Sequence, residues 1–156
     1  MSSATPAPTS VNDSLVGSSF PPPERYRVSA VKIAEFAAAV GATSPLHFDQ
    51  DAARAAGYKD VVAPPTFAVV VAQRAEFAYV NSPESGIDFS RVVHAEESFE
   101  HHRPIVAGEV LEATAHVESI THRAGLSFVT TRVEIADGDF PVATVRSTLA
   151  VRGEGR

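Results

Sequence analysis

The 156-residue chain contains no cysteine and no tryptophan, and its single methionine is Met1. Disulfides and thiolate metal sites are therefore excluded. Basic residues are also scarce, because 13 Lys and Arg stand against 19 Asp and Glu, for a formal net charge of -6. No cluster of Lys and Arg is present that would neutralise nucleic-acid phosphates. We therefore expect no nucleic-acid partner.

Long hydrophobic runs are lacking as well. The longest apolar stretch, Val61 to Ala72, is interrupted by Pro64, Pro65 and Thr66 and is shorter than the roughly 20 residues that cross a bilayer. The first ten residues carry no basic cluster followed by an apolar segment. The sequence thus predicts neither a membrane span nor a secretory signal, and we expect the protein in the cytoplasm.

The remaining composition, 44% hydrophobic and 21% charged, is typical of one globular domain. Residues 1–14 are rich in Ser, Thr, Pro and Ala and show no periodic apolar pattern, so we expect a disordered tail there. The single domain is predicted over residues 15–152, with a second short tail over 153–156.

Helical periodicity appears in the first half of the chain. A helix is predicted over 30–40, with Ser29 as its N-cap and one buried stripe formed by Ile33, Phe36, Ala37 and Val40. A short helical turn is predicted over 50–56. A further helix over 66–79 is apolar nearly all round in its first turns, which indicates that it lies inside the domain.

From Phe89 onward the apolar period changes to two. Alternating runs over 111–117, 129–135 and 143–151 predict long antiparallel strands, with turns at 122–125 and 137–139. Strands that follow one strongly buried helix favour an α+β fold in which a curved antiparallel sheet wraps around that helix.

Three segments carry a family resemblance: SPLHFD at 44–49, APPTF at 63–67 and HRPIVAGE at 102–109. They resemble the MaoC-like hot-dog dehydratases, and more narrowly the FAS1-like dehydratase N-terminal domain of HadA/HadC type. This resemblance implies a hot-dog fold and an acyl thioester ligand carried on coenzyme A or acyl carrier protein, with no cofactor. It also implies pairing of two such folds, as a homodimer or as a heterodimer with a catalytic hot-dog subunit.

The resemblance further implies a histidine base and two supporting features. Catalytic family members have an Asp five positions before this histidine and a His-Gly pair whose glycine N–H binds the thioester oxygen. Here His47 is present, but Ala42 occupies the Asp position and Ser44 replaces the usual Asn. Pro64 and Pro65 stand at the His-Gly position, and proline has no N–H. The catalytic pair is therefore expected to be degenerate.

Candidate site residues follow from this comparison. His47 and Asp49 are the candidate catalytic residues, although Asp49 is also well placed to cap the turn over 50–56, and that alternative is favoured. The N–H groups of Thr66 and Phe67 at a helix start offer a weaker oxyanion contact. The candidate substrate-binding residues are Thr66, Phe67, Val70 and His94.

A metal site near His101 and His102 is not expected. Neighbouring residues of a regular strand point to opposite faces, so these two histidines cannot chelate one ion.

The sequence therefore predicts a subunit of a (3R)-hydroxyacyl thioester dehydratase or hydratase, a hydro-lyase of fatty-acid metabolism that shapes the acyl channel. One alternative is a non-catalytic hot-dog homodimer that binds acyl thioesters. Another is a hot-dog thioesterase, for which Glu76 is the candidate carboxylate.

Overall fold

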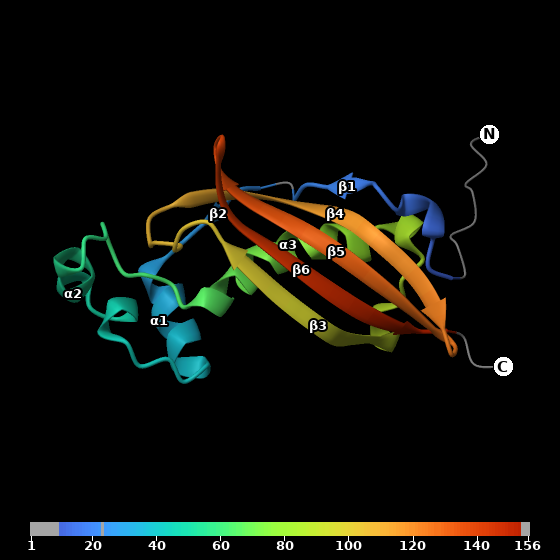
Figure 1. Ribbon diagram of the computed structural model, residues 1–156, viewed down its shortest axis with the longest axis horizontal. Coiled ribbons are helices and arrows are strands. Elements are labelled where there is room, and N and C mark those ends of the chain that lie inside the picture. Colours follow the sequence, from blue (N-terminus) through green and yellow to red (C-terminus); the bar gives the residue numbers. More distant parts are fainter. Residues whose placement is uncertain (1–9, 23, 154–156) are drawn as a thin grey trace.

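A computed structural model describes residues 10–22 and 24–153. Its sheet has the strand order β1-β4-β5-β6-β3, and every pairing is antiparallel. Figure 1 shows this sheet curving around one helix, α3. The strands are β1 (Ser19–Phe20), β3 (Val92–His101), β4 (Val110–Arg123), β5 (Leu126–Asp137) and β6 (Phe140–Arg152), and β2 (Tyr26–Arg27) also pairs with β4. The α+β prediction is confirmed.

Tight hairpins connect the three longest strands. Ala124 and Gly125 join β4 to β5, and both have positive φ, 52° and 77°. That backbone is the one that two-residue hairpin turns require. Gly138 and Asp139 join β5 to β6. The predicted turns at 122–125 and 137–139 are thus confirmed.

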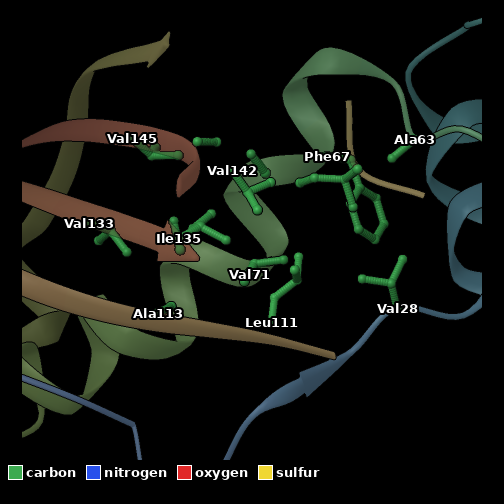
Figure 2. Packing of buried hydrophobic residues seen from close by; sticks show 14 of the residues in the cluster. Val28, Ala63, Phe67, Val71, Leu111, Ala113, Val133, Ile135, Val142 and Val145 are labelled. Carbon is green, nitrogen blue, oxygen red and sulfur yellow. The ribbon is translucent and has the colours of Figure 1, made fainter. Parts of the chain in front are cut away.

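Helix α3 (Ala68–Val80) is continuous with a 3-10 turn, Pro65–Phe67, that opens it. The helix buries seven of its side chains, which explains why its first turns lack a polar face. Figure 2 shows Phe67 and Val71 packed among residues of the sheet, including Leu111, Ile135 and Val145. This apolar packing holds the sheet against the helix.

Two more helices precede α3. Helix α1 (Ala30–Ala39) begins at Ser29, whose hydroxyl accepts from the Lys32 N–H at 3.0 Å, as predicted. Helix α2 (Gln50–Ala55) is the predicted turn over 50–56. Short 3-10 turns lie at Asp13–Leu15, Pro45–His47, Pro83–Ser85 and Phe89–Arg91. Within the described part of the chain, no helix has the length and apolar character to cross a membrane.

The predicted N-terminal tail is too long. Residues 1–9 of the predicted tail lie outside the described residues, as do residues 154–156 of the C-terminal one. Residues 10–14 are ordered against the domain, because Val11 is buried beside Tyr79 and the Asn12 N–H donates to the Ser85 carbonyl at 2.9 Å. A single apolar anchor within a polar segment gives no periodic signal, which is why the pattern misplaced this boundary.

Candidate functional site

His47 ends the short 3-10 turn Pro45–His47, which the Ser44 hydroxyl caps. The His47 Nδ1 donates to the Val62 carbonyl oxygen at 2.6 Å. In return, the Val62 N–H donates to the Leu46 carbonyl at 2.8 Å, so the loop is fastened to the segment that leads into α3. Within residues 10–22 and 24–153, no carboxylate oxygen lies within 4.0 Å of either ring nitrogen of His47.

Asp49 is placed at the start of α2. Its Oδ1 accepts from the N–H groups of Asp51 and Ala52, at 2.9 and 3.2 Å. The carboxylate therefore occupies the N-cap, which is the alternative that the sequence favoured. A catalytic role for Asp49 stays a prediction.

The opening of α3 differs from the arrangement that an oxyanion site needs. The Phe67 N–H already donates to the Pro64 carbonyl at 2.9 Å, so one of the two predicted oxyanion donors is occupied. The Phe67 side chain is fully buried, Val70 is half-buried and Thr66 is exposed. His101, at the end of β3, donates from Nε2 to the Pro65 carbonyl at 2.7 Å. This contact joins the sheet to the helix start, and the sequence pattern did not indicate it.

A second group of titratable side chains lies farther along α3. His94 on β3 has its Nε2 2.6 Å from Oε2 of Glu97. The Ser147 hydroxyl, on β6, donates to the same oxygen at 3.0 Å. Glu76 projects from α3 and is only 3% exposed. The sequence singled out His94 and Glu76 separately, but it gave no signal that they lie together with Glu97 and Ser147.

The electrostatics of this group favour bound protons. Burial, followed by the nearby Glu97 carboxylate, raises the pKa of Glu76 from its ordinary 4.5 to about 7, although His94 and the Ser147 hydroxyl oppose the rise. Burial also raises the pKa of Glu97, against the same two neighbours. A carboxyl with a pKa near neutrality is suited to acid–base chemistry.

In the described part of the chain, no three His, Asp or Glu side chains are arranged to hold a metal ion. His101 instead stacks on Phe99, with ring centroids 6.3 Å apart.

Comparisons with known proteins bear on the whole domain. The family described as "FAS1-like, dehydratase domain region" matches residues 14–145. A UPF0336 protein of Saccharopolyspora erythraea is 50% identical over 145 residues, which cover 92% of each chain. A UPF0336 protein of Leifsonia xyli subsp. xyli is 48% identical and covers 92% of this chain and 97% of its own.

Solved structures show the same fold. The HadBC (3R-hydroxyacyl-ACP dehydratase) complex from Mycobacterium tuberculosis is similar with a TM-score of 0.78 and 28% identity, over 87% of this chain and 96% of that chain. A MaoC-like dehydratase is similar with a TM-score of 0.77 and 30% identity, over 90% of this chain but 43% of its own, longer chain. The predicted hot-dog fold is thereby confirmed.

Proposed function

Because the chain belongs to the FAS1-like dehydratase domain family, we propose that it is a MaoC-like subunit of a (3R)-hydroxyacyl thioester dehydratase or hydratase. In this role it shapes the acyl channel and completes the site of a second hot-dog subunit, which supplies the histidine base. The observation that carries the proposal is the state of His47, whose imidazole is held by a backbone carbonyl and, among the described residues, has no carboxylate oxygen within 4.0 Å.

The reaction removes a proton from C2 of the thioester while hydroxide leaves C3. It needs a base near neutral pKa, and it needs donors at the thioester oxygen, where negative charge grows. His47 retains a ring nitrogen, Nε2, that is free to act as a base, because Nδ1 donates to Val62. The methyl group of Ala42 cannot orient water or the substrate hydroxyl, and the prolines at 64 and 65 provide no N–H for the thioester oxygen.

Two features support a partner subunit. The similar HadBC structure is a complex of two named subunits. In this chain, β3 is an edge strand of ten residues that pairs only with β6 among the described strands. An edge with unpaired N–H and C=O groups is open to pairing with another chain. The family and the similar HadBC dehydratase support a thioester on acyl carrier protein or coenzyme A as the substrate.

The test is hydration of a crotonyl thioester, measured with the isolated chain and with a hot-dog partner that contains an intact Asp-Asn-Pro-hydrophobic-His loop. We expect turnover near the uncatalysed rate for the isolated chain, and enzyme-like turnover once the partner is added. If the isolated chain turns over the thioester at ordinary enzyme rates, and His47→Ala abolishes this turnover, then the proposal that its catalytic pair is incomplete is wrong.

The second candidate function is a homodimer that binds acyl thioesters without catalysing a reaction. A His47 without a neighbouring carboxylate is also expected in such a protein. Its signature is a stable homodimer that binds an acyl thioester in calorimetry and gains no activity with the partner.

A further inference from the structure

A polar layer divides the apolar core of the domain into two clusters. We use "polar layer" for Glu76, Glu97, Thr131 and Ser147. On β5, Thr131 lies between the buried Val129 and Val133, and on β6, Ser147 lies between the buried Val145 and Leu149. Three of the four residues are nine-tenths or more buried, with Glu76 3%, Thr131 0% and Ser147 1% exposed.

The strand register aligns this layer across the sheet. Glu97 on β3 pairs with Ser147 on β6, and Ser147 pairs with Thr131 on β5. The row of side chains faces inward, toward α3, which contributes Glu76 from the other side. The layer therefore runs from the centre of the sheet to its open edge at β3.

A β-bulge places His94 at the end of the layer. The pairing of β3 with β6 shifts between His94 and Glu96. The extra residue, Ala95, lets His94 and Glu97, three apart in sequence, lie on one face with Nε2 and Oε2 2.6 Å apart. In a regular strand, residues three apart point to opposite faces, whereas bulges re-aim side chains and are common beside active sites. His94 itself is exposed at the strand edge.

The donors and acceptors of the polar layer do not balance. The Ser147 hydroxyl has one proton, which it donates to Glu97 Oε2 at 3.0 Å. Glu97 Oε1 and Thr131 Oγ1 are both buried without a hydrogen-bond partner. An unpaired buried acceptor is costly, and two neighbouring carboxylates repel. A proton held on one of the two carboxyl groups relieves this repulsion.

Two exposed aromatic rings adjoin, in the sequence, the elements that carry the layer. Phe77 follows Glu76 on α3 and Phe89 precedes β3, and their rings meet edge-on with centroids 5.8 Å apart. Both rings are exposed, Phe77 by 40% and Phe89 by 58%. Exposed aromatic surface favours contact with an apolar acyl chain, whereas carboxyl groups disfavour an anion.

We propose that His94 and Glu97, backed by Ser147 and Glu76, form a second acid–base site that delivers a proton to the hydroxyl group of a 3-hydroxyacyl thioester at the β3 edge. This inference rests on the proposed function, and it names what the chain adds to the composite site. Glu97 positions His94, and Glu76 stores the proton that passes through Ser147 and Glu97.

During the removal of water, one proton leaves C2 and another reaches the hydroxyl group on C3. The C2 proton goes to the histidine base of the catalytic subunit, and the electron pair of the C2–H bond forms the second bond between C2 and C3. The C3–O bond breaks, and the departing hydroxide takes a proton from the imidazolium of His94 to leave as water. The polar layer then returns a proton to His94 and takes up another from solvent. The histidine of the catalytic subunit releases the C2 proton to solvent, so both groups regain their starting protonation. Hydration runs through the same steps in reverse.

The first experiment follows the Glu76 carboxyl of the full chain by carbon-13 NMR across pH. We expect its titration midpoint to fall in Glu97→Gln, which removes the like charge, and to rise in His94→Gln, which removes the opposing cation. Glu100→Gln is the matched control, because Glu100 is an exposed glutamate on the same strand. Equal midpoints in all three variants would overturn the proton-sharing layer.

The second experiment measures dehydration by the chain together with its catalytic partner. We expect the rate to fall roughly tenfold or more in His94→Gln and in Glu97→Gln, and to stay at the wild-type value in Glu100→Gln. Circular dichroism establishes that each variant is folded. If Glu97→Gln fails to fold, His94→Gln still provides the test, because His94 is exposed and its substitution should not disturb the core. An active complex in which His94→Gln retains the full rate overturns the second site but not the proposed function. A complex that shows no dehydration activity overturns the proposed function. In that case the NMR titration of Glu76 still tests, by itself, whether the polar layer shares a proton.

Discussion

Nδ1 of His47 lies 2.6 Å from the carbonyl oxygen of Val62, and this contact fixes the tautomer of the imidazole. A carbonyl accepts only from an N–H, so the neutral ring carries its proton on Nδ1 and leaves Nε2 unprotonated. Unlike a carboxylate, the carbonyl brings no negative charge to balance an imidazolium. The contact thus orients His47 without making it part of a charged pair.

This contact has a measurable effect on stability. We expect His47→Ala to lower the free energy of unfolding by about 1 kcal/mol, because the ring is half-buried and its hydrogen bond is lost. Urea unfolding followed by circular dichroism measures the change. His102→Ala is the control, since His102 is exposed, and it should change stability by less than about 0.5 kcal/mol. Equal effects of the two substitutions would contradict a structural role for the His47 ring.

Two substitutions of Asp49 distinguish a capping role from a catalytic role for its carboxylate. Loss of the two N-cap hydrogen bonds in Asp49→Ala should lower the free energy of unfolding by about 1 kcal/mol. Asp49→Asn should restore most of it, because Asn caps helices nearly as well as Asp. If the Asn variant is stable but the complex with the partner loses its dehydration activity, then the carboxylate takes part in the chemistry and capping alone does not explain Asp49.

The regular elements could be predicted because each carries a repeated local signal. The stripe that follows Ser29 predicted α1, but its last member was wrong, because Val40 lies just beyond Ala39 at the helix end and is 52% exposed. The alternation over 129–135 predicted β5. The run over 66–79 predicted a buried helix, although its first residues form a 3-10 turn because the paired prolines restrict the backbone there.

The polar layer could not be predicted in the same way. Glu96 and Glu97 are consecutive in the sequence, and only the bulge at Ala95 decides that Glu97 faces α3. The alternation does place Thr131 on the same face as Val129 and Val133, and the structure buries it there. Its alignment with Ser147 and Glu97 follows from strand register, which depends on contacts between distant segments.

Phe67 joins the start of α3 to the elements before it. Its ring meets Phe36 of α1 and Tyr26 of β2, with centroids 5.5 and 6.4 Å apart. We expect Phe67→Ala to lower the free energy of unfolding by about 3–5 kcal/mol, because the ring is fully buried and its removal leaves a cavity. Thermal unfolding provides the measurement. Phe140→Ala serves as the control because Phe140 is 72% exposed, and comparable losses in both variants would refute the anchoring role.

Glu76 gives the domain a specific dependence of stability on pH. Burial raises the pKa of this carboxyl to about 7 in the folded chain, against an ordinary value of 4.5. Below pH 4.5 the Glu76 carboxyl is protonated in both the folded and the unfolded chain, so its ionisation does not lower the free energy of unfolding. Between pH 4.5 and 7 the unfolded chain releases this proton while the folded chain keeps it, so the folded state loses stability as pH rises. Above pH 7 the loss levels off, at about 3 kcal/mol.

The Glu76→Gln variant isolates this contribution, because an amide of nearly the same shape does not titrate. We expect the free energy of unfolding of the wild type, relative to the variant, to fall between pH 4.5 and 7 and then to stay constant. Urea unfolding at a series of pH values measures the difference, in which the titration of all other groups largely cancels. Glu100→Gln, on an exposed glutamate, should give a flat difference. A wild type that gains stability relative to Glu76→Gln as pH rises would mean that the buried carboxyl is ionised and well compensated, and that the polar layer holds no proton at neutral pH.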